Sequence, residues 1–164
     1  MANKLLAKMK KDKAFVDLLT TEQKPVEWLS TNCISVNLLL SGKIRGGIKK
    51  GSISMIAAGS GWGKSMIGYA VLKSAQDSGM NCFIIDTENS VNYELLTKLG
   101  IDMKEVGVFG PTNLIPAIKQ FVIKLADGQT LEERRNTFIL FDSWGPLVTQ
   151  QSVDKGAEGS SAAD

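Results

Sequence analysis

The sequence predicts an α/β fold in which helices cover both faces of a parallel sheet. Four short apolar runs alternate with segments of helical length, a pattern typical of βαβ units. A glycine-rich segment separates the first run from the helix that follows it, where such folds often bind ligands. With 164 residues, 43% of them hydrophobic, the chain is long enough to bury one core without disulfides or metals.

The segment before the first apolar run is predicted to be helical and basic. Residues 1–20 are expected to form a modestly amphipathic helix, interrupted at Asp12 and Lys13. A short helix is expected over Val36–Leu40, capped by Ser35 and ended by Gly42.

Positive charge gathers in two places along the chain. Residues 1–13 carry five lysines against Asp12, and residues 43–50 carry four basic side chains and no acid, so each segment has a net charge of +4. Such clusters suit contact with phosphates or an acidic neighbour, although a solvated surface accounts for them equally well.

Four strands and three longer helices follow from the apolar pattern and the turn residues. The strands are predicted at Ile53–Ala58, Asn81–Asp86, Val106–Phe109 and Thr137–Asp142. The helices are predicted over about Lys64–Asp77, from a cap at Ser90 to Gly100, and over roughly Thr112–Asp127, with Pro116 near the first turn of the last one. Residues 150–164 are polar and are expected to form a flexible tail.

The composition excludes several classes of chemistry. The chain has no histidine, so Ser-His-Asp and Cys-His catalysis and His-ligated metals are ruled out. The two cysteines, Cys33 and Cys82, lie far apart in sequence and are expected to be reduced thiols in a cytoplasmic protein. We expect neither secretion nor a membrane span, because no apolar stretch approaches the ~20 residues that a spanning helix needs.

The strongest motif lies between the first predicted strand and the first long helix. There, glycines let the backbone N–H groups and the helix N-terminus converge on phosphate oxygens. Lys64 would neutralise the β/γ-phosphates, and the Ser65 hydroxyl would bind Mg²⁺. This P-loop, which begins with alanine in place of the usual glycine, comprises Ala58, Gly59, Ser60, Gly61, Trp62, Gly63, Lys64 and Ser65.

Two acids at predicted strand ends complete a candidate ATP site. Asp142 ends an apolar strand, at the sheet edge where a second ligand for Mg²⁺ is needed. Glu88, just beyond Asp86, would lie over the same edge and activate a water for attack on the γ-phosphate. The alternative is that Asp86 and Glu88 are turn and capping residues.

At these residues the chain resembles the RecA-type recombinase ATPases, most closely those of T-even phages. The similarity runs from about residue 31 to residue 142. It rests on Leu40–Gly47 with Gly51, on the P-loop, and on the Asp86-Thr87-Glu88 and Asp142-Ser143 elements.

The resemblance implies a DNA-dependent ATPase that uses ATP and Mg²⁺, forms filaments on single-stranded DNA and promotes strand exchange. Glu88 would be the catalytic carboxylate, assisted by Lys64, with Ser65 and Asp142 on the metal. Residues 1–30 would form an oligomerisation segment, residues 31–149 a partial ATPase core with a RecA-like parallel sheet, and residues 150–164 a tail or the start of a DNA-binding loop.

The sequence departs from the family pattern in two respects. The family's sheet and DNA-binding loops continue beyond the Asp-Ser pair, whereas only residues 144–164 remain here. The P-loop strand is therefore expected at a sheet edge, completed by a carboxyl-terminal portion in the same or a separate chain. The isolated chain is expected to be marginally stable or self-associating and not to exchange DNA strands, and its ATPase activity is left open. Tyr93 does not fall where the family's adenine-side tyrosine is expected.

Two other functions fit the same core. A replicative helicase shares it, but such helicases have a Ser-Met-Glu-like segment and an Asp-Tyr pair in place of Asp86-Thr87-Glu88 and Asp142-Ser143. A non-catalytic module that binds nucleotide and assists filament assembly is the third reading.

Overall fold

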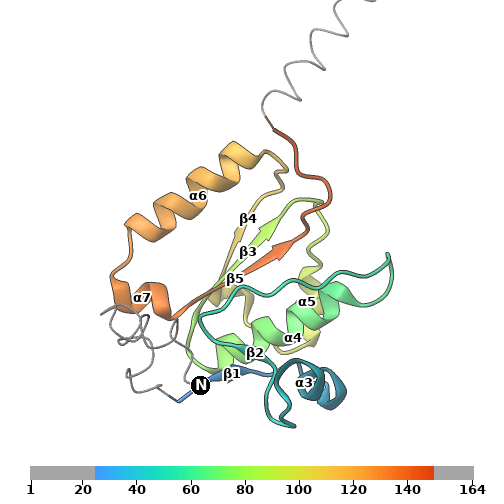
Figure 1. The fold of residues 1–164 in the computed structure, drawn as a ribbon. Coiled ribbons are helices and arrows are strands. Elements are labelled where there is room, and N and C mark those ends of the chain that lie inside the picture. The colour runs from blue at the N-terminus through green and yellow to red at the C-terminus, as the bar shows by residue number, and fades with distance from the viewer. Residues whose placement is uncertain (1–24, 150–164) are drawn as a thin grey trace, which may run out of the picture.

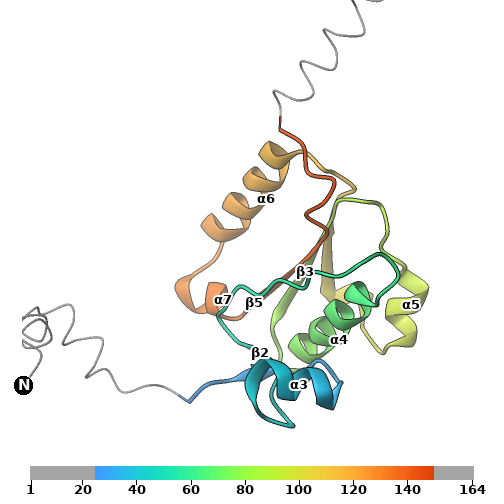
Figure 2. The same cartoon turned by 45° about the vertical axis from the view of Figure 1, so that its right-hand side comes forward.

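The computed structural model describes residues 25–149, which form a parallel sheet between two layers of helices (Figures 1 and 2). Helices α4 and α5 lie on one side of the sheet and α6 on the other. The α/β class predicted from the sequence is confirmed. The helix expected over residues 1–20 and the tail expected over residues 150–164 lie outside the described residues.

The sheet has three parallel strands in the order β4-β3-β5. They are β3 (Asn81–Asp86), β4 (Val106–Phe109) and β5 (Thr137–Asp142), each at its predicted bounds. The pairing of β3 with β5 starts at Asn81 and Thr137 and ends with Asp86 opposite Asp142. Both acids therefore lie at the carboxyl edge of the sheet, as the sequence predicted.

The helices differ from the prediction mainly at their ends. They are α3 (Ile34–Ser41), α4 (Lys64–Asp77), α5 (Tyr93–Lys98), the 3-10 helix η1 (Met103–Glu105), α6 (Ile115–Asp127) and α7 (Leu131–Arg135). A short antiparallel pair, β1 (Trp28–Leu29) with β2 (Ile48–Lys49), precedes the P-loop segment. Neither this pair nor η1 or α7 was predicted.

Two predicted helix caps are wrong. The N-cap of α3 is Cys33, not Ser35, although Gly42 ends the helix in a left-handed conformation as expected. The N-cap of α5 is Asn92, whose side chain accepts a hydrogen bond from the backbone N–H of Leu95. Ser90 instead belongs to the preceding turn, because its N–H donates to the Asp86 carboxylate.

The strand predicted at Ile53–Ala58 is also wrong. This segment is irregular, and Figures 1 and 2 show it as a coil between β2 and α4. Ile53 is fully exposed and Met55 is 77% exposed. The segment pairs with no strand of the described sheet, although β5 has a partner on one edge only, so no ladder hydrogen bonds hold it extended. Its apolar side chains therefore face solvent.

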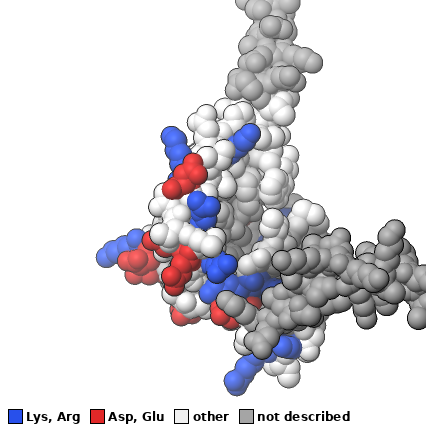
Figure 3. All heavy atoms as spheres, turned by 60° about the vertical axis from the view of Figure 1, so that its left-hand side comes forward, with Lys and Arg blue, Asp and Glu red and all other residues white. Residues whose placement is uncertain are grey.

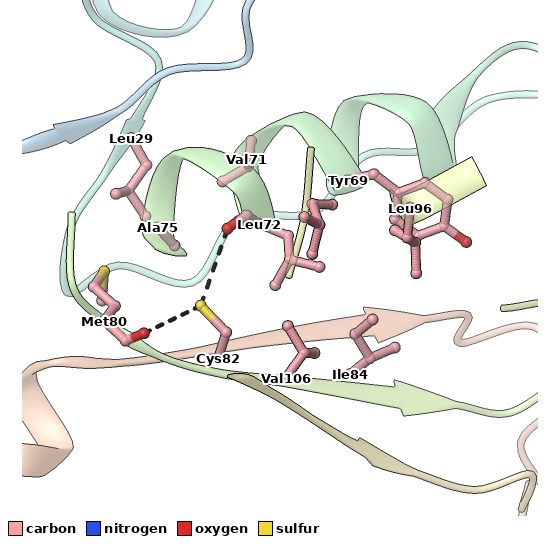
Figure 4. Close-up of a cluster of buried hydrophobic side chains, with 11 residues drawn as sticks. Leu29, Tyr69, Val71, Leu72, Ala75, Met80, Cys82, Ile84, Leu96 and Val106 are labelled. Carbon is pink, nitrogen blue, oxygen red and sulfur yellow. Dashed lines mark hydrogen bonds between the residues drawn. The ribbon is translucent and has the colours of Figure 1, made fainter. Parts of the chain in front are cut away.

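The main core lies between α4 and the sheet (Figure 4). Leu72 and Ala75 of α4 pack against Ile84 and Cys82 of β3, and all four are at most 2% exposed. Burial raises the pKa of the Cys82 thiol to about 11. This packing fixes the position of α4, the helix that begins at the P-loop, relative to the ends of the strands.

Helix α6 covers the opposite face of the sheet through aromatic contacts. The Phe121 ring stacks on Phe109 of β4 with centroids 4.3 Å apart and meets Phe83 of β3 edge-on at 6.2 Å. The sheet is therefore covered on both faces, as expected for parallel strands.

Charged side chains are mixed in sign on the face over α6 and α7 (Figure 3). Two members of the basic 43–50 cluster make intramolecular contacts. Lys50 pairs with Glu27 at 3.1 Å, and the Lys43 ammonium lies 5.5 Å from the centre of the Trp28 ring. Between residues 25 and 149, no helix is both long and apolar enough to cross a membrane.

Candidate active site

The P-loop brings its glycines, its lysine and the start of α4 together. Gly61 and Gly63 have positive φ angles of 76° and 80°, which side chains other than glycine rarely adopt. These turns lead directly into α4, whose N-cap, Gly63, provides no side-chain hydrogen bond. The partial positive charge at the N-terminus of this 14-residue helix therefore faces the loop, which suits an anionic ligand.

Lys64 folds back over the loop. Its ammonium donates hydrogen bonds to the carbonyl oxygens of Ala58 at 3.0 Å and Gly59 at 2.9 Å. Both acceptors are exposed carbonyls, so a phosphate oxygen can replace them without leaving a buried group unpaired. The lysine is thus already placed within the loop.

Trp62 covers the loop from outside. A Cβ atom added at Gly59 would lie 3.2 Å from the indole nitrogen, so the ring packs closely over this part of the loop. The tryptophan is itself 80% exposed. Most of the indole surface therefore faces solvent.

Asp142 has a buried oxygen that lacks a partner. The Oδ2 atom of its carboxylate is inaccessible to solvent and accepts no hydrogen bond from the part of the chain that the structure describes. A buried, unpaired carboxylate oxygen is costly, and a cation or a donor from a ligand would satisfy it.

Helix α4 connects the P-loop to this carboxylate. A methyl group added at Gly68, in the second turn of α4, would lie 2.9 Å from Leu140 of β5. One residue on, burial raises the pKa of Tyr69, and the nearby charges of Asp142 and Asp86 raise it further. The tyrosine hydroxyl therefore stays protonated to a higher pH than that of a free tyrosine. Nothing in the sequence pattern singled out Tyr69.

Asp86 organises the turn after β3. Its Oδ1 atom accepts hydrogen bonds from the backbone N–H of Glu88 and of Ser90, and its Oδ2 atom accepts one from Val91. It is only 4% exposed. For Asp86, the alternative of a turn residue is therefore the right one.

Glu88 is held differently. Its side chain is exposed, and its Oε1 atom accepts a hydrogen bond from the Ser143 hydroxyl. Thr87, between the two acids, bonds to both backbone groups of Ser143. The structure thus brings Glu88, Asp142 and Ser143 together at the sheet edge. Tyr93, in contrast, is exposed at the start of α5.

The donor atoms suit a small, hard cation. Asp142 offers a carboxylate oxygen, and Ser65 offers a hydroxyl on the first turn of α4. Mg²⁺ prefers such oxygen ligands, with its other positions taken by water and phosphate. Residues 25–149 contain no cluster of three or more Asp, Glu, Cys or His side chains able to hold a metal by themselves. Phosphate oxygens and water would supply the further ligands that a cation bound by Ser65 and Asp142 needs.

Comparison with known proteins identifies the relatives of this arrangement. The chain matches the RecA N-terminal domain family over residues 1–155. It is 30% identical over 109 residues to the mitochondrial DNA repair protein recA homolog of Dictyostelium discoideum, covering 66% of this chain and 23% of that protein. It is 32% identical over 88 residues to Protein RecA of Deinococcus radiodurans, covering 54% of this chain and again 23% of the relative. The chain thus corresponds to only a minor part of either relative.

Proposed function

Because the chain belongs to the RecA N-terminal domain family, we propose that it is the ATPase part of a DNA recombination and repair protein. The Dictyostelium relative is a mitochondrial DNA repair protein, which supports this role. The proposal includes assembly into filaments on single-stranded DNA and strand exchange. A closer relationship to the T-even-phage recombinase UvsX, and a place in the cytoplasm of a phage's host, are finer parts of the same proposal.

One observation carries the proposal: the unpaired carboxylate oxygen of Asp142 lies at the sheet edge beside the helix that begins at the P-loop. A buried carboxylate oxygen without a donor is unfavourable, and a cation bound together with a ligand would satisfy it. In an ATP-dependent enzyme, Asp142 would help to hold the metal that accompanies the nucleotide, and that metal would offset the charge on the phosphates.

The P-loop residues 58–65 would bind the phosphates of ATP. Backbone N–H groups of the loop and the N-terminus of α4 provide donors, and the Lys64 ammonium moves from the carbonyls of Ala58 and Gly59 to the β/γ-phosphates. Ser65 and Asp142 would hold Mg²⁺, which when bound neutralises charge on the phosphates. Trp62 lines the outside of the loop.

Glu88 would act as the general base. Its exposed carboxylate can accept the proton of a water aligned with the γ-phosphate, while the hydrogen bond from Ser143 keeps it at the sheet edge. Asp86 is too fully engaged with backbone donors to share this task.

The remaining parts of the chain would mediate assembly. We assign self-association to residues 1–30 and the beginning of a DNA-binding loop to residues 150–164, on either side of the core at 31–149. The exposed apolar side chains at 53–58 suggest that a further chain segment covers them, supplied in the same or a separate polypeptide.

The direct test measures phosphate release from ATP by the complete gene product, with and without single-stranded DNA. The Lys64→Ala variant, purified in parallel, measures contaminating ATPase. We expect turnover that rises when DNA is added and is absent from the variant. Nucleotide binding without turnover under any condition would favour the non-catalytic assembly module, and turnover stimulated only during duplex unwinding would favour a helicase.

A further inference from the structure

A threonine hydroxyl ties the ends of β3 and β5 together. The backbone N–H of Thr87 donates to the Asp142 carbonyl at 3.0 Å, one residue beyond the last strand pair. The buried Thr87 hydroxyl then donates to the Ser143 carbonyl at 2.7 Å and accepts from the Ser143 N–H at 2.8 Å. A single side chain thus satisfies both backbone polar groups of one residue.

The tie continues from Ser143 to Glu88. With its backbone fixed by Thr87, Ser143 donates its own hydroxyl proton to the Oε1 atom of Glu88. The main chain of Glu88 is held from the other side, since its N–H donates to Asp86 at 3.1 Å. An exposed glutamate would otherwise sample several rotamers, so these contacts restrict the carboxylate to one region of the sheet edge.

Thr87 also holds the backbone next to Asp142. Ser143 follows it directly, and the Thr87 N–H accounts for its carbonyl oxygen, so the backbone on the carboxyl side of Asp142 is held by one neighbouring residue. The carboxylate with the unpaired oxygen and the carboxylate of Glu88 are therefore set relative to each other through Thr87.

We propose that Thr87 is a positioning residue for Glu88, acting through Ser143. This inference rests on the proposed ATPase function, in which Glu88 takes a proton from water. Thr87 touches neither reacting group itself. Its hydroxyl fixes the serine that orients the general base, so its removal slows the chemical step more than it weakens nucleotide binding.

The test compares three variants of the complete gene product. Thr87→Val keeps the shape of the side chain and removes both hydrogen bonds, whereas Thr87→Ser keeps the hydroxyl. Thr97→Val is the matched control, because the Thr97 hydroxyl also bonds to a backbone carbonyl, that of Tyr93 at 2.8 Å, but lies on the exposed surface of α5. If Thr87→Val does not melt cooperatively, Thr87→Ala replaces it.

Three quantities are measured: hydrogen exchange at the Ser143 amide, affinity for a fluorescent ATP analogue, and kcat with single-stranded DNA. In Thr87→Val we expect exchange faster by roughly tenfold or more, kcat lower by roughly tenfold, and affinity within about twofold of wild type, since two neutral hydrogen bonds are lost. In Thr87→Ser we expect wild-type values of exchange, kcat and affinity, and in Thr97→Val we expect none of the three to change. Adding Thr87→Val to Glu88→Gln lowers the rate no further.

Two kinds of failure are distinguishable. Unchanged exchange at Ser143 in Thr87→Val, or a loss of affinity with kcat intact, overturns the positioning role while wild-type turnover leaves the proposed function standing. If the wild type does not turn over, or Glu88→Gln turns over normally, the proposed catalysis is wrong, and Thr87 then has no base to position even if exchange at Ser143 is accelerated.

Discussion

Replacing Asp142 with asparagine should separate the stability of the fold from its ability to bind nucleotide. The substitution keeps the shape of the side chain but removes the charge that its buried, unpaired Oδ2 atom shares. Asp142 lies opposite Asp86 in the pairing of β3 with β5, so neutralising one carboxylate also reduces repulsion between two neighbouring charges. The nucleotide-free protein should therefore become more stable.

The magnitudes follow from the state of that oxygen. Leaving a buried neutral polar group unpaired costs about 1–3 kcal/mol and a charged one costs more. An amide in the same place still lacks a partner but carries no charge, so we expect a gain of about 1 kcal/mol. At a nucleotide concentration of 100 Kd, binding stabilises the wild type by about 2.7 kcal/mol. A tenfold weaker affinity in Asp142→Asn reduces that to about 1.4 kcal/mol at the same concentration.

The assay is denaturant unfolding with and without ATP and Mg²⁺. Asp127→Asn is the control, because Asp127 is exposed at the end of α6, and it should match the wild type within about 0.5 kcal/mol in both conditions. Equal stabilisation of Asp142→Asn and wild type by Mg-ATP would refute the assignment of Asp142 to the metal. A loss of stability without nucleotide would show that the carboxylate supports the fold.

Three further predictions concern the P-loop, the buried thiol and the open sheet. Lys64→Ala should lose binding of a fluorescent ATP analogue while its circular dichroism stays unchanged, because the ammonium contacts only exposed carbonyls in the free protein; retained affinity would argue against the P-loop assignment. Burial raises the pKa of the Cys82 thiol from 9.0 to about 11, so the free energy of unfolding should be independent of this group below pH 9 and should fall as the pH rises towards 11. Alkylation of the folded protein at pH 8 should label the exposed Cys33 but not the buried Cys82. The 164-residue chain alone should self-associate in sedimentation experiments through its exposed apolar segment at 53–58, and a monodisperse, cooperatively melting monomer would contradict this.

The sequence predicted the sheet well where partners are available. The strands 81–86, 106–109 and 137–142 were correctly placed because their apolar runs pair with one another and are covered by α4 and α6. The run at Ile53–Ala58 has the same character but no strand beside it in the described chain. An apolar run indicates that burial is favourable, not which element provides it.

Local hydrogen-bonding choices explain the errors at helix ends. Ser90 and Asn92 are both residue types that commonly cap helices. In the structure the Ser90 N–H donates to the buried Asp86 carboxylate, so Ser90 lies in the turn and Asn92 caps α5. The short helix α7 carried a readable signal, because Thr130 and Glu133 form a capping box at its start.

The acids of the candidate site were predictable from their positions in the sequence, but the residues that hold them in place by hydrogen bonds were not. Glu88 and Asp142 were expected at the carboxyl edge because both follow apolar strands, and the structure brings them there. The part played by Thr87 depends on the register that places Ser143 beside it, and a single sequence does not reveal that register.

The central claim, that this site hydrolyses ATP with Glu88 as the base, is tested most directly by Glu88→Gln in the complete gene product. The measurement is single-turnover hydrolysis of ATP with saturating single-stranded DNA, together with nucleotide affinity. The amide can still accept the hydrogen bond from Ser143 but cannot take a proton, so we predict near-normal affinity and a rate lower by about 10²-fold or more. Hydrolysis at the wild-type rate, with affinity unchanged, would contradict the account.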